Sequence, residues 1–384
     1  MVKDNNEIYR KLRQEINKMP IAFPETNSGV EIRLLKYLFT PEEAEIAVHL
    51  NIVPEDLKRI HNRLEKKGIT ISIDDLEKTL DNMVIKGAIL GGRIFESLKG
   101  DKKHYSLNQL AIGMFESQAD RLTPEYARDF FSYFDDQFYK DFYGTKTAQM
   151  RTVPISVSLK PQLHVEPYNN IRDYIKNLDD DIVVMNCVCR QARDARGHPC
   201  THSDIRETCF SFGDVARFFL GKGTGRAITS QEALQILDKA EEAGFVLQPE
   251  NNRKPLFMCC CCRDCCHVLR GFKLHARPAD LFHTNYFSKV DPVKCNGCTL
   301  CEKKCAMEAI KVEDEIAHVN LDRCLGCGVC VSACKYNALS LCKKDTVYVP
   351  PKNHDAMYQK IMVERFGIAK TLQTVMKVLV GAKA

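Results

Sequence analysis

The first 186 residues contain no cysteine, and all 19 cysteines of the 384-residue chain follow that point. The chain also lacks an apolar run of about 18 residues, the length that a membrane-spanning helix requires. Its N-terminal residues do not contain the apolar core of a signal peptide. We therefore expect a cytoplasmic protein with no transmembrane segment. In a reducing cytoplasm so many thiols cannot form a disulfide framework, so they indicate metal binding or catalysis.

The composition is that of an ordinary folded chain, with 45% hydrophobic and 27% charged residues. Its length predicts about two to three domains. A net charge of +5 is too small to argue for or against nucleic acid as a partner. The glycine-rich stretch at 221–226 lacks the GxxxxGK[ST] spacing of a phosphate-binding loop, so we interpret it as a turn.

Eight cysteines form two copies of the spacing CxxCxxCxxxC, with equivalent positions 29 residues apart. Three thiolates at this spacing can surround one face of a cubane cluster, while the fourth reaches the neighbouring cluster. The predicted ligands of two 4Fe-4S clusters are therefore crossed: Cys295, Cys298, Cys301 and Cys334 for one, and Cys324, Cys327, Cys330 and Cys305 for the other. A zinc site needs only four cysteines in paired CxxC hairpins and leaves the longer repeat unexplained.

The internal repeat continues outside the cysteines, for example at Gly297 and Gly326. Residues 288–342 closely resemble the bacterial two-cluster ferredoxin, in which each half is a strand, a cluster loop and a helix related by a pseudo-twofold axis. The segment departs from that pattern after the fourth cysteine, where the usual proline is Ala306 in one copy and Lys335 in the other. The turn is then less rigid, but no ligand is lost.

The cysteine-free half predicts four helices, at 31–38, 41–50, 54–67 and 72–86, followed by a β-hairpin at 88–107 with a basic tip at 99–103. Thr40 and Pro41 are typical of a helix start. This order is that of a winged helix, which we assign to residues 1–120.

Winged helices commonly bind DNA, so the charge of the helix in the reading position matters. That helix carries four acidic residues against two lysines: Asp74, Asp75, Glu77 and Asp81 against Lys78 and Lys86. Contacts to phosphate come from lysine and arginine. A docking or structural role is therefore favoured over DNA binding.

Residues 121–160 predict an aromatic helix and an extended linker. Four phenylalanines recur every four residues and therefore share one stripe of the helix: Phe130, Phe134, Phe138 and Phe142. We interpret this stripe as packed core or as a seam between domains.

In residues 161–287, two short apolar strands, at 181–185 and 255–258, each run directly into cysteines. With helices between them they predict an α/β layer in which the strands lie side by side and bring their cysteines to one joint metal site. The predicted ligands are Cys187, Cys189, Cys200, Cys209, Cys259, Cys261, Cys262, Cys265 and Cys266. Nearby polar residues that could hydrogen-bond to this site are Arg190, His198, His202, Arg263, Asp264 and His267.

With Cys260, ten cysteines gather in this segment, which exceeds one site. A third iron–sulfur cluster is favoured over zinc, because the repeat already indicates a protein built with iron and sulfide. A fourth cluster, or spare thiols around a single cluster, remain alternatives.

Residues 343–384 predict a polar linker and a helical tail. The last helix, at 368–379, has an apolar stripe with lysines beside it. Binding to a membrane surface is one interpretation; packing against the body or a partner is the favoured one.

Nearly the whole chain resembles a family of cytoplasmic ferredoxin-like proteins of anaerobic bacteria and archaea that carry an N-terminal winged-helix domain. The resemblance rests on FTPEEA at 39–44, CVCR at 187–190, ETCFSFG at 207–213, the cysteine run at 259–266 with LRG at 269–271, and the repeat. It implies iron–sulfur binding and electron transfer, and gives no substrate. In similar sequences the position of Cys260 is often Asn, so Cys260 is left out of the ligands.

The predicted fold is therefore α+β and multidomain: a winged-helix domain, a central cysteine-rich α/β domain and a ferredoxin-like domain with a helical tail. The predicted function is electron transfer, with single electrons passing through the clusters to or from a redox enzyme. One alternative is a redox-sensing regulator that reads DNA, which the acidic helix disfavours. Another is an oxidoreductase acting at the site formed by residues 187–266, for which no nucleophile, base or nucleotide motif is present.

Overall fold

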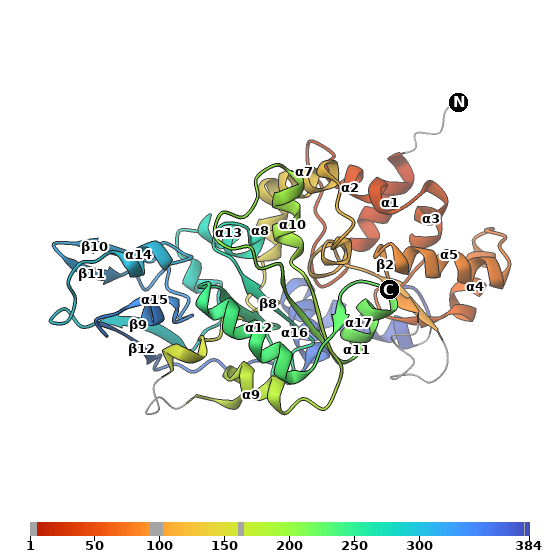
Figure 1. Cartoon of the computed structure of the whole chain (residues 1–384). Helices are drawn as coiled ribbons and strands as arrows, with labels where there is room; N and C mark the ends of the chain where they lie inside the picture. Colours follow the sequence, from red (N-terminus) through yellow and green to blue (C-terminus); the bar gives the residue numbers. More distant parts are fainter. Residues whose placement is uncertain (1–5, 93–102, 160–164, 380) are drawn as a thin grey trace. The chain divides into compact units, whose positions relative to one another are not determined.

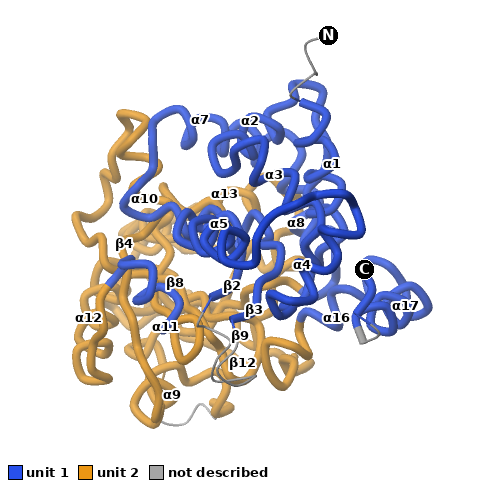
Figure 2. The backbone as a smooth tube through the Cα atoms, turned by 90° about the vertical axis from the view of Figure 1, so that its right-hand side faces the viewer, with its two compact units in different colours: residues 1–147, 217–225, 358–384 blue, residues 148–216, 226–357 orange. Residues whose placement is uncertain are grey.

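The computed structural model describes residues 6–92, 103–159, 165–379 and 381–384 (Figure 1). The chain divides into two compact units (Figure 2). The first comprises residues 1–147, 217–225 and 358–384, and the second comprises residues 148–216 and 226–357. All 19 cysteines belong to the second unit.

In its described residues, the N-terminal part of the first unit contains five helices and a small sheet. The helices are α1 (Asn6–Ile16), α2 (Val30–Leu38), α3 (Pro41–Ala47), α4 (Leu57–Lys66) and α5 (Ile73–Ile85). Strands β1 (Glu55–Asp56), β2 (Ile89–Gly92) and β3 (His104–Leu107) pair in the order β1-β3-β2. The helix order and both arms of the predicted hairpin are present, whereas residues 93–102, with most of the basic tip, lie outside the described residues.

Hydrogen bonds and ion pairs fix this small fold locally. Thr40 caps α3, because its side chain accepts a hydrogen bond from the Glu43 backbone N–H and the Glu43 carboxylate accepts one from the Thr40 N–H. Lys103, beside β3, pairs with two acids of α5, Glu77 at 2.8 Å and Asp81 at 2.7 Å. The acidic surface of α5 therefore binds its own hairpin.

The rest of the first unit is helical as well. It holds η2 (Leu110–Met114), η3 (Glu116–Gln118), α7 (Pro124–Tyr133), η4 (Phe134–Phe138), α8 (Tyr139–Phe142), the end of α11 (Gly213–Gly221), most of α16 (His354–Phe366), and α17 (Ile368–Leu379). The four phenylalanines of the predicted stripe are all buried, at most 5% exposed. Four residues of the apolar stripe of α17 are exposed: Ile368, Leu372, Val375 and Met376.

The second unit is built on a five-stranded antiparallel sheet in the order β6-β4-β5-β8-β7. The strands are β4 (Ile182–Asn186), β5 (Glu207–Phe212), β6 (Arg226–Ala227), β7 (Val246–Pro249) and β8 (Phe257–Cys261). The helices of this region are η5 (Ser156–Ser158), η6 (Pro167–Asn169), α9 (Ile171–Lys176), α10 (Val188–Ala195), α12 (Ser230–Glu242), α13 (His267–Lys273) and η7 (Pro278–Asp280). Two helices, α9 and α12, pack on one face of the sheet.

This sheet differs from the predicted layer in one respect that matters for the site. The strands now called β4 and β8 were expected side by side, but β5 lies between them and pairs with both. Residues 207–212 form a strand that the sequence analysis does not predict. Their alternation of Thr208, Phe210 and Phe212 with polar residues and Cys209 is the period of a strand with one buried face.

Strand alternation sorts the cysteines of β5 and β8 between the two faces. Phe210 pairs with Met258, and both belong to the core beneath α9 and α12, together with Cys260. Cys209 pairs with Cys259, so these two thiols point to the opposite face. Cys261, two residues further along β8, shares that face.

The cysteine repeat forms a separate part of the second unit, with two strand pairs and two short helices. Strands β9 (Tyr286–Val290) and β12 (Leu339–Lys343) form one antiparallel pair, and β10 (Ile310–Glu313) and β11 (Ile316–Val319) form another. Two short helices, α14 (Leu300–Lys304) and α15 (Val329–Ala333), occupy equivalent places in the two copies. Their cysteines share a small core with Ile310, Ala317 and Leu339.

Candidate metal centres

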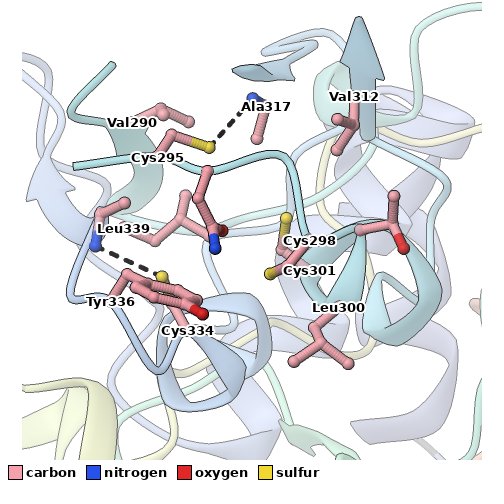
Figure 3. Close-up of a pocket in the computed structure, with 13 residues that line it drawn as sticks. Val290, Cys295, Cys298, Leu300, Cys301, Val312, Ala317, Cys334, Tyr336 and Leu339 are labelled. Carbon is pink, nitrogen blue, oxygen red and sulfur yellow. Dashed lines mark hydrogen bonds between the residues drawn. The ribbon is translucent and has the colours of Figure 1, made fainter. Parts of the chain in front are cut away.

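One cavity in the repeat is bounded by four thiols from both copies (Figure 3). Cys295, Cys298 and Cys301 come from the first copy, and Cys334 comes from the second. Apolar side chains, among them Val290, Val312 and Leu339, complete the wall.

The second cavity has the reciprocal composition. Cys324, Cys327 and Cys330 of the second copy line it together with Cys305 of the first copy. The structure thus gathers the eight cysteines into two groups of four, and in each group the fourth thiol is the one that ends the other copy's helix.

Backbone N–H groups point at the sulfur atoms of these cysteines. Ala309 N–H donates to Cys305 Sγ at 3.2 Å, and Ala338 N–H, the equivalent group in the other copy, donates to Cys334 Sγ at 3.3 Å. Ala317 N–H donates to Cys295 Sγ at 3.4 Å. Such bonds stabilise sulfur that carries negative charge, as a metal-bound thiolate does.

The glycines between the first two cysteines of each copy are required by close packing. Both have left-handed backbone, with φ of 66° at Gly297 and 62° at Gly326. A Cβ at Gly326 would lie 2.2 Å from the carbonyl oxygen of Tyr286, and one at Gly297 would lie 2.7 Å from Glu315 Cα. Only glycine allows each loop to close around its cavity.

Burial disfavours thiolates in the second cavity unless positive charge is present. Burial raises the pKa of Cys327 to about 12, and it also raises the pKa of Cys330 and Cys305. Thiolate ligands here therefore need compensating cations, which the irons of a cluster would supply. Cys298 of the first cavity is exposed to solvent.

The central cysteines form a second kind of site, a closed ring of six thiols. Each thiol hydrogen-bonds to two neighbours, in the order Cys187, Cys189, Cys266, Cys261, Cys259, Cys209 and back to Cys187. We call this group the six-thiol ring. Three members lie at the starts of α10 and α13, and three lie on the face of β5 and β8 opposite α9 and α12.

Donors and acceptors alternate around the ring. Hydrogen bonds from Cys209 and Cys261 lower the pKa of Cys259 to about 6, and equivalent bonds lower the pKa of Cys187 and Cys266. The three donor thiols between them have a raised pKa for the same reason. Metal binding replaces the shared protons of such an arrangement.

A buried cation lies next to this ring. Arg190 is 0% exposed, its guanidinium donates to Thr208 Oγ1 at 2.5 Å and to the Cys260 carbonyl oxygen at 3.2 Å, and its Nε has no partner among the described residues. Burial opposes its charge, but negative charge on Cys187 and neighbouring thiols raises its pKa. A buried arginine of this kind balances an anionic thiolate cluster.

Polar side chains also share the face of the ring. Gln248 is the strand neighbour of Cys259, it is 0% exposed, and neither polar atom of its amide has a partner within the described part of the chain. Ser211, two residues after Cys209, is also 0% exposed. Its hydroxyl likewise has no hydrogen-bond partner within the described part of the chain. Buried amides and hydroxyls are nearly always satisfied, so these groups fit a polar or anionic occupant. The sequence prediction missed Gln248 because β7 was not recognised.

The remaining central cysteines lie apart from the ring. Cys200, Cys262 and Cys265 gather with the Asp264 carboxylate, all donor atoms lying within 4.8 Å of one another. The predicted joint site is therefore two groups of side chains, because Cys262 lies just after the end of β8. Cys260 belongs to neither group, since its side chain points into the core under α12.

Of the polar residues expected nearby, Arg190, Asp264 and His267 are adjacent to the thiols, and Arg263 donates to the Lys303 carbonyl oxygen. His202 lies where the charge of Asp264 acts on it, whereas His198 is exposed.

Residues 294–338 match the family model of the 4Fe-4S dicluster domain. This segment is a ferredoxin-like iron–sulfur module. No curated protein and no solved structure matches the chain. None of the helices in the described residues has the length and apolar character needed to cross a membrane. The module and the cysteines around it indicate iron–sulfur electron transfer.

Proposed function

We propose that this protein transfers single electrons between a redox enzyme partner and a central metal site, through two 4Fe-4S clusters held by the module. The observation that carries the proposal is the pair of cavities, each bounded by four thiols drawn from both copies of the repeat. Clusters bound there supply one-electron redox chemistry, and the chain positions them. Cys295, Cys298, Cys301 and Cys334 would hold the first, and Cys324, Cys327, Cys330 and Cys305 the second.

The packing of the module supports an order for the electron path. Cys298 is exposed at the first cavity, which gives a partner access to that end. Val329 lines the second cavity and also belongs to the core under α12. The Cys327 carbonyl oxygen accepts a hydrogen bond from Ile155 N–H at 3.0 Å, beside β7. The second cavity is thus the one joined to the central sheet.

The six-thiol ring is proposed as the site of a further iron–sulfur cluster. Six thiols exceed the four that a cubane takes, so the ring supplies a full ligand set with two thiols to spare. Arg190 offsets the negative charge, and Gln248 and Ser211 provide polar atoms on the same face.

Iron and sulfide analysis of the anaerobically purified chain tests the proposal. Three cubanes require roughly twelve irons and twelve sulfides per chain. Mössbauer spectra should show only cluster iron, and the reduced protein should give the EPR spectrum of interacting clusters. A measured content of about eight irons per chain would contradict the proposed ring cluster. A protein without sulfide would overturn the electron-transfer role.

The winged-helix interpretation of the first unit belongs to the same proposal, as a docking element for the partner. Its α5 helix is acidic, and Lys103 of its own hairpin pairs with Glu77 and Asp81. An acidic helix repels phosphate, which supports docking of a protein over reading of DNA.

A further inference from the structure

We propose that Cys200, Cys262, Cys265 and Asp264 bind a single zinc ion, separate from the six-thiol ring and from the two module clusters. We call these four residues the Cys3Asp group. The proposal does not depend on electron transfer, since a zinc ion has no redox chemistry.

The spacing of the donor atoms fits one ion. Cys200 Sγ lies 3.5 Å from Cys262 Sγ and 3.6 Å from Asp264 Oδ1, and Cys265 Sγ lies 3.3 Å from the same oxygen. Zinc binds sulfur at about 2.3 Å in a tetrahedron, which separates two sulfur ligands by about 3.8 Å.

The same comparison separates this group from the others in the chain. Among the described residues, the Cys3Asp group is the one set of three or more His, Cys, Asp or Glu donor atoms that all lie within 4.8 Å of one another. Neither the module cavities nor the six-thiol ring is so compact. Every donor of the Cys3Asp group, by contrast, is close to every other.

The chemistry of the donors is that of a closed structural site. Three thiolates and one carboxylate are all ligands that zinc accepts, and four protein ligands leave no open position. The three thiols are buried, at 8%, 1% and 3% exposed for Cys200, Cys262 and Cys265. The other carboxylate oxygen, Asp264 Oδ2, accepts a hydrogen bond from Thr201 Oγ1 at 3.3 Å, which orients the ligand.

The position of the group explains what the ion does. Cys200 lies in the irregular segment between α10 and β5, and Cys262 and Cys265 lie in the turn between β8 and α13. An ion bound here ties two segments that no strand pairing joins. The elements α10, β5, β8 and α13, together with the N-cap residues of the two helices, carry all six thiols of the ring. The zinc therefore fixes the frame in which the ring assembles.

Zinc, iron and sulfide measured together on the full chain test this assignment. The wild-type protein, grown with zinc and washed with a mild chelator, should carry about one zinc per chain. Zinc K-edge absorption should show three sulfur ligands at about 2.3 Å and one oxygen ligand at about 2.0–2.2 Å. Iron does not contribute at this edge, so the result is independent of the clusters.

Matched variants complete the test. Cys200→Ser and Asp264→Asn should lower zinc to well under one equivalent, whereas Cys260→Ala, a buried cysteine of the same run outside both groups, should retain it. Because loss of the ion can weaken the ring, the wild-type zinc content and ligand shell decide the matter when a variant fails to fold. Wild-type protein without zinc, a zinc shell of four sulfurs, or zinc retained by Asp264→Asn and Cys200→Ser would overturn the proposal. About eight irons with zinc intact would instead count against the ring cluster alone, and a sulfide-free protein with zinc intact would count against the proposed electron transfer alone.

Discussion

Cys259 lies directly opposite Cys209 across two neighbouring strands, and both thiols point to the face of the sheet that α9 and α12 leave free. This pair joins the segment that follows β4 to the run that ends β8, which are the two parts of the ring. Removing three of its six thiols leaves fewer than the four that a cubane requires. The triple variant Cys187→Ser, Cys209→Ser, Cys261→Ser should therefore lose about four irons and melt at a lower temperature, because metal and fold are linked.

Iron analysis and a thermal melt measure this outcome, with Cys260→Ala as the control, since Cys260 faces the opposite core. A folded triple variant with its full iron content would show that the ring carries no cluster.

Cys305 should act on the cluster of the other copy. Its thiol lies in the cavity of Cys324, Cys327 and Cys330, so Cys305→Ala should alter or remove the EPR signal of that cluster and leave the other intact. Cys342→Ala is the control, because Cys342 lines neither cavity. Damage confined to the Cys295 cluster would contradict the crossed ligand sets.

Gln248 should affect the reduction potential of the ring cluster without being one of its ligands. A hydrogen-bond donor near a cluster favours the reduced, more negative state, and one such bond to a charged group contributes about 1.5–3 kcal/mol. Gln248→Leu should therefore shift the reduction potential of that cluster to more negative values, by roughly tens of millivolts, with iron content unchanged. A potentiometric titration followed by EPR gives the shift, and Gln248→Glu, which adds negative charge, should move it further in the same direction. An unchanged potential in both variants would place Gln248 outside the cluster's influence.

The first unit should bind DNA only weakly. Since the acids of α5 pair with the chain's own Lys103, affinity should stay in the non-specific range, about 10⁻⁴–10⁻⁶ M at physiological salt. Fluorescence anisotropy with random and genomic duplexes measures it. A nanomolar, sequence-selective complex would favour the regulator over the electron carrier.

The His354–Glu250 pair should make stability depend on pH. Burial opposes the charge of the imidazole, but the buried Glu250 carboxylate, 2.5 Å from His354 Nδ1, outweighs burial and raises the pKa of His354. Protonated His354 therefore stabilises the folded state fully below its ordinary pKa, and this stabilisation is lost as pH rises through the raised value. Melting temperatures across that range should fall less steeply for His354→Gln than for the wild type. Parallel curves for the two proteins would contradict the role of the pair.

Sequence spacing alone was enough to identify the iron–sulfur module, because in a CxxCxxCxxxC repeat the ligands are close in the chain and the cluster dictates their spacing. The central site could not be resolved in the same way. Whether two of its cysteines lie close together depends on the register of β5 against β8. It also depends on β7, a strand that no sequence pattern predicts here. Long-range pairing of short strands is set by packing, as between Phe210 and Met258, and not by local sequence.

The division of the run at 259–262 was nevertheless implicit in its alternation. Residues Cys259 and Cys261 had to share one face of a strand and Cys260 the other, once that strand was recognised. What alternation cannot give is the end of β8 at Cys261, which frees Cys262 to turn toward Cys200.

Cys259, Cys260 and Cys261 end β8 and Cys262 follows directly, so the thiols alone do not specify the register of this strand. A slip by one residue would exchange the two faces, yet sulfur would still be presented toward the ring. Iron that binds before the sheet has formed could therefore stabilise the wrong register. The correct alignment must come from Met258, which is 0% exposed and whose place in the core no cysteine can fill. We therefore expect the sheet to form with Met258 in its core before metal binds at the ring.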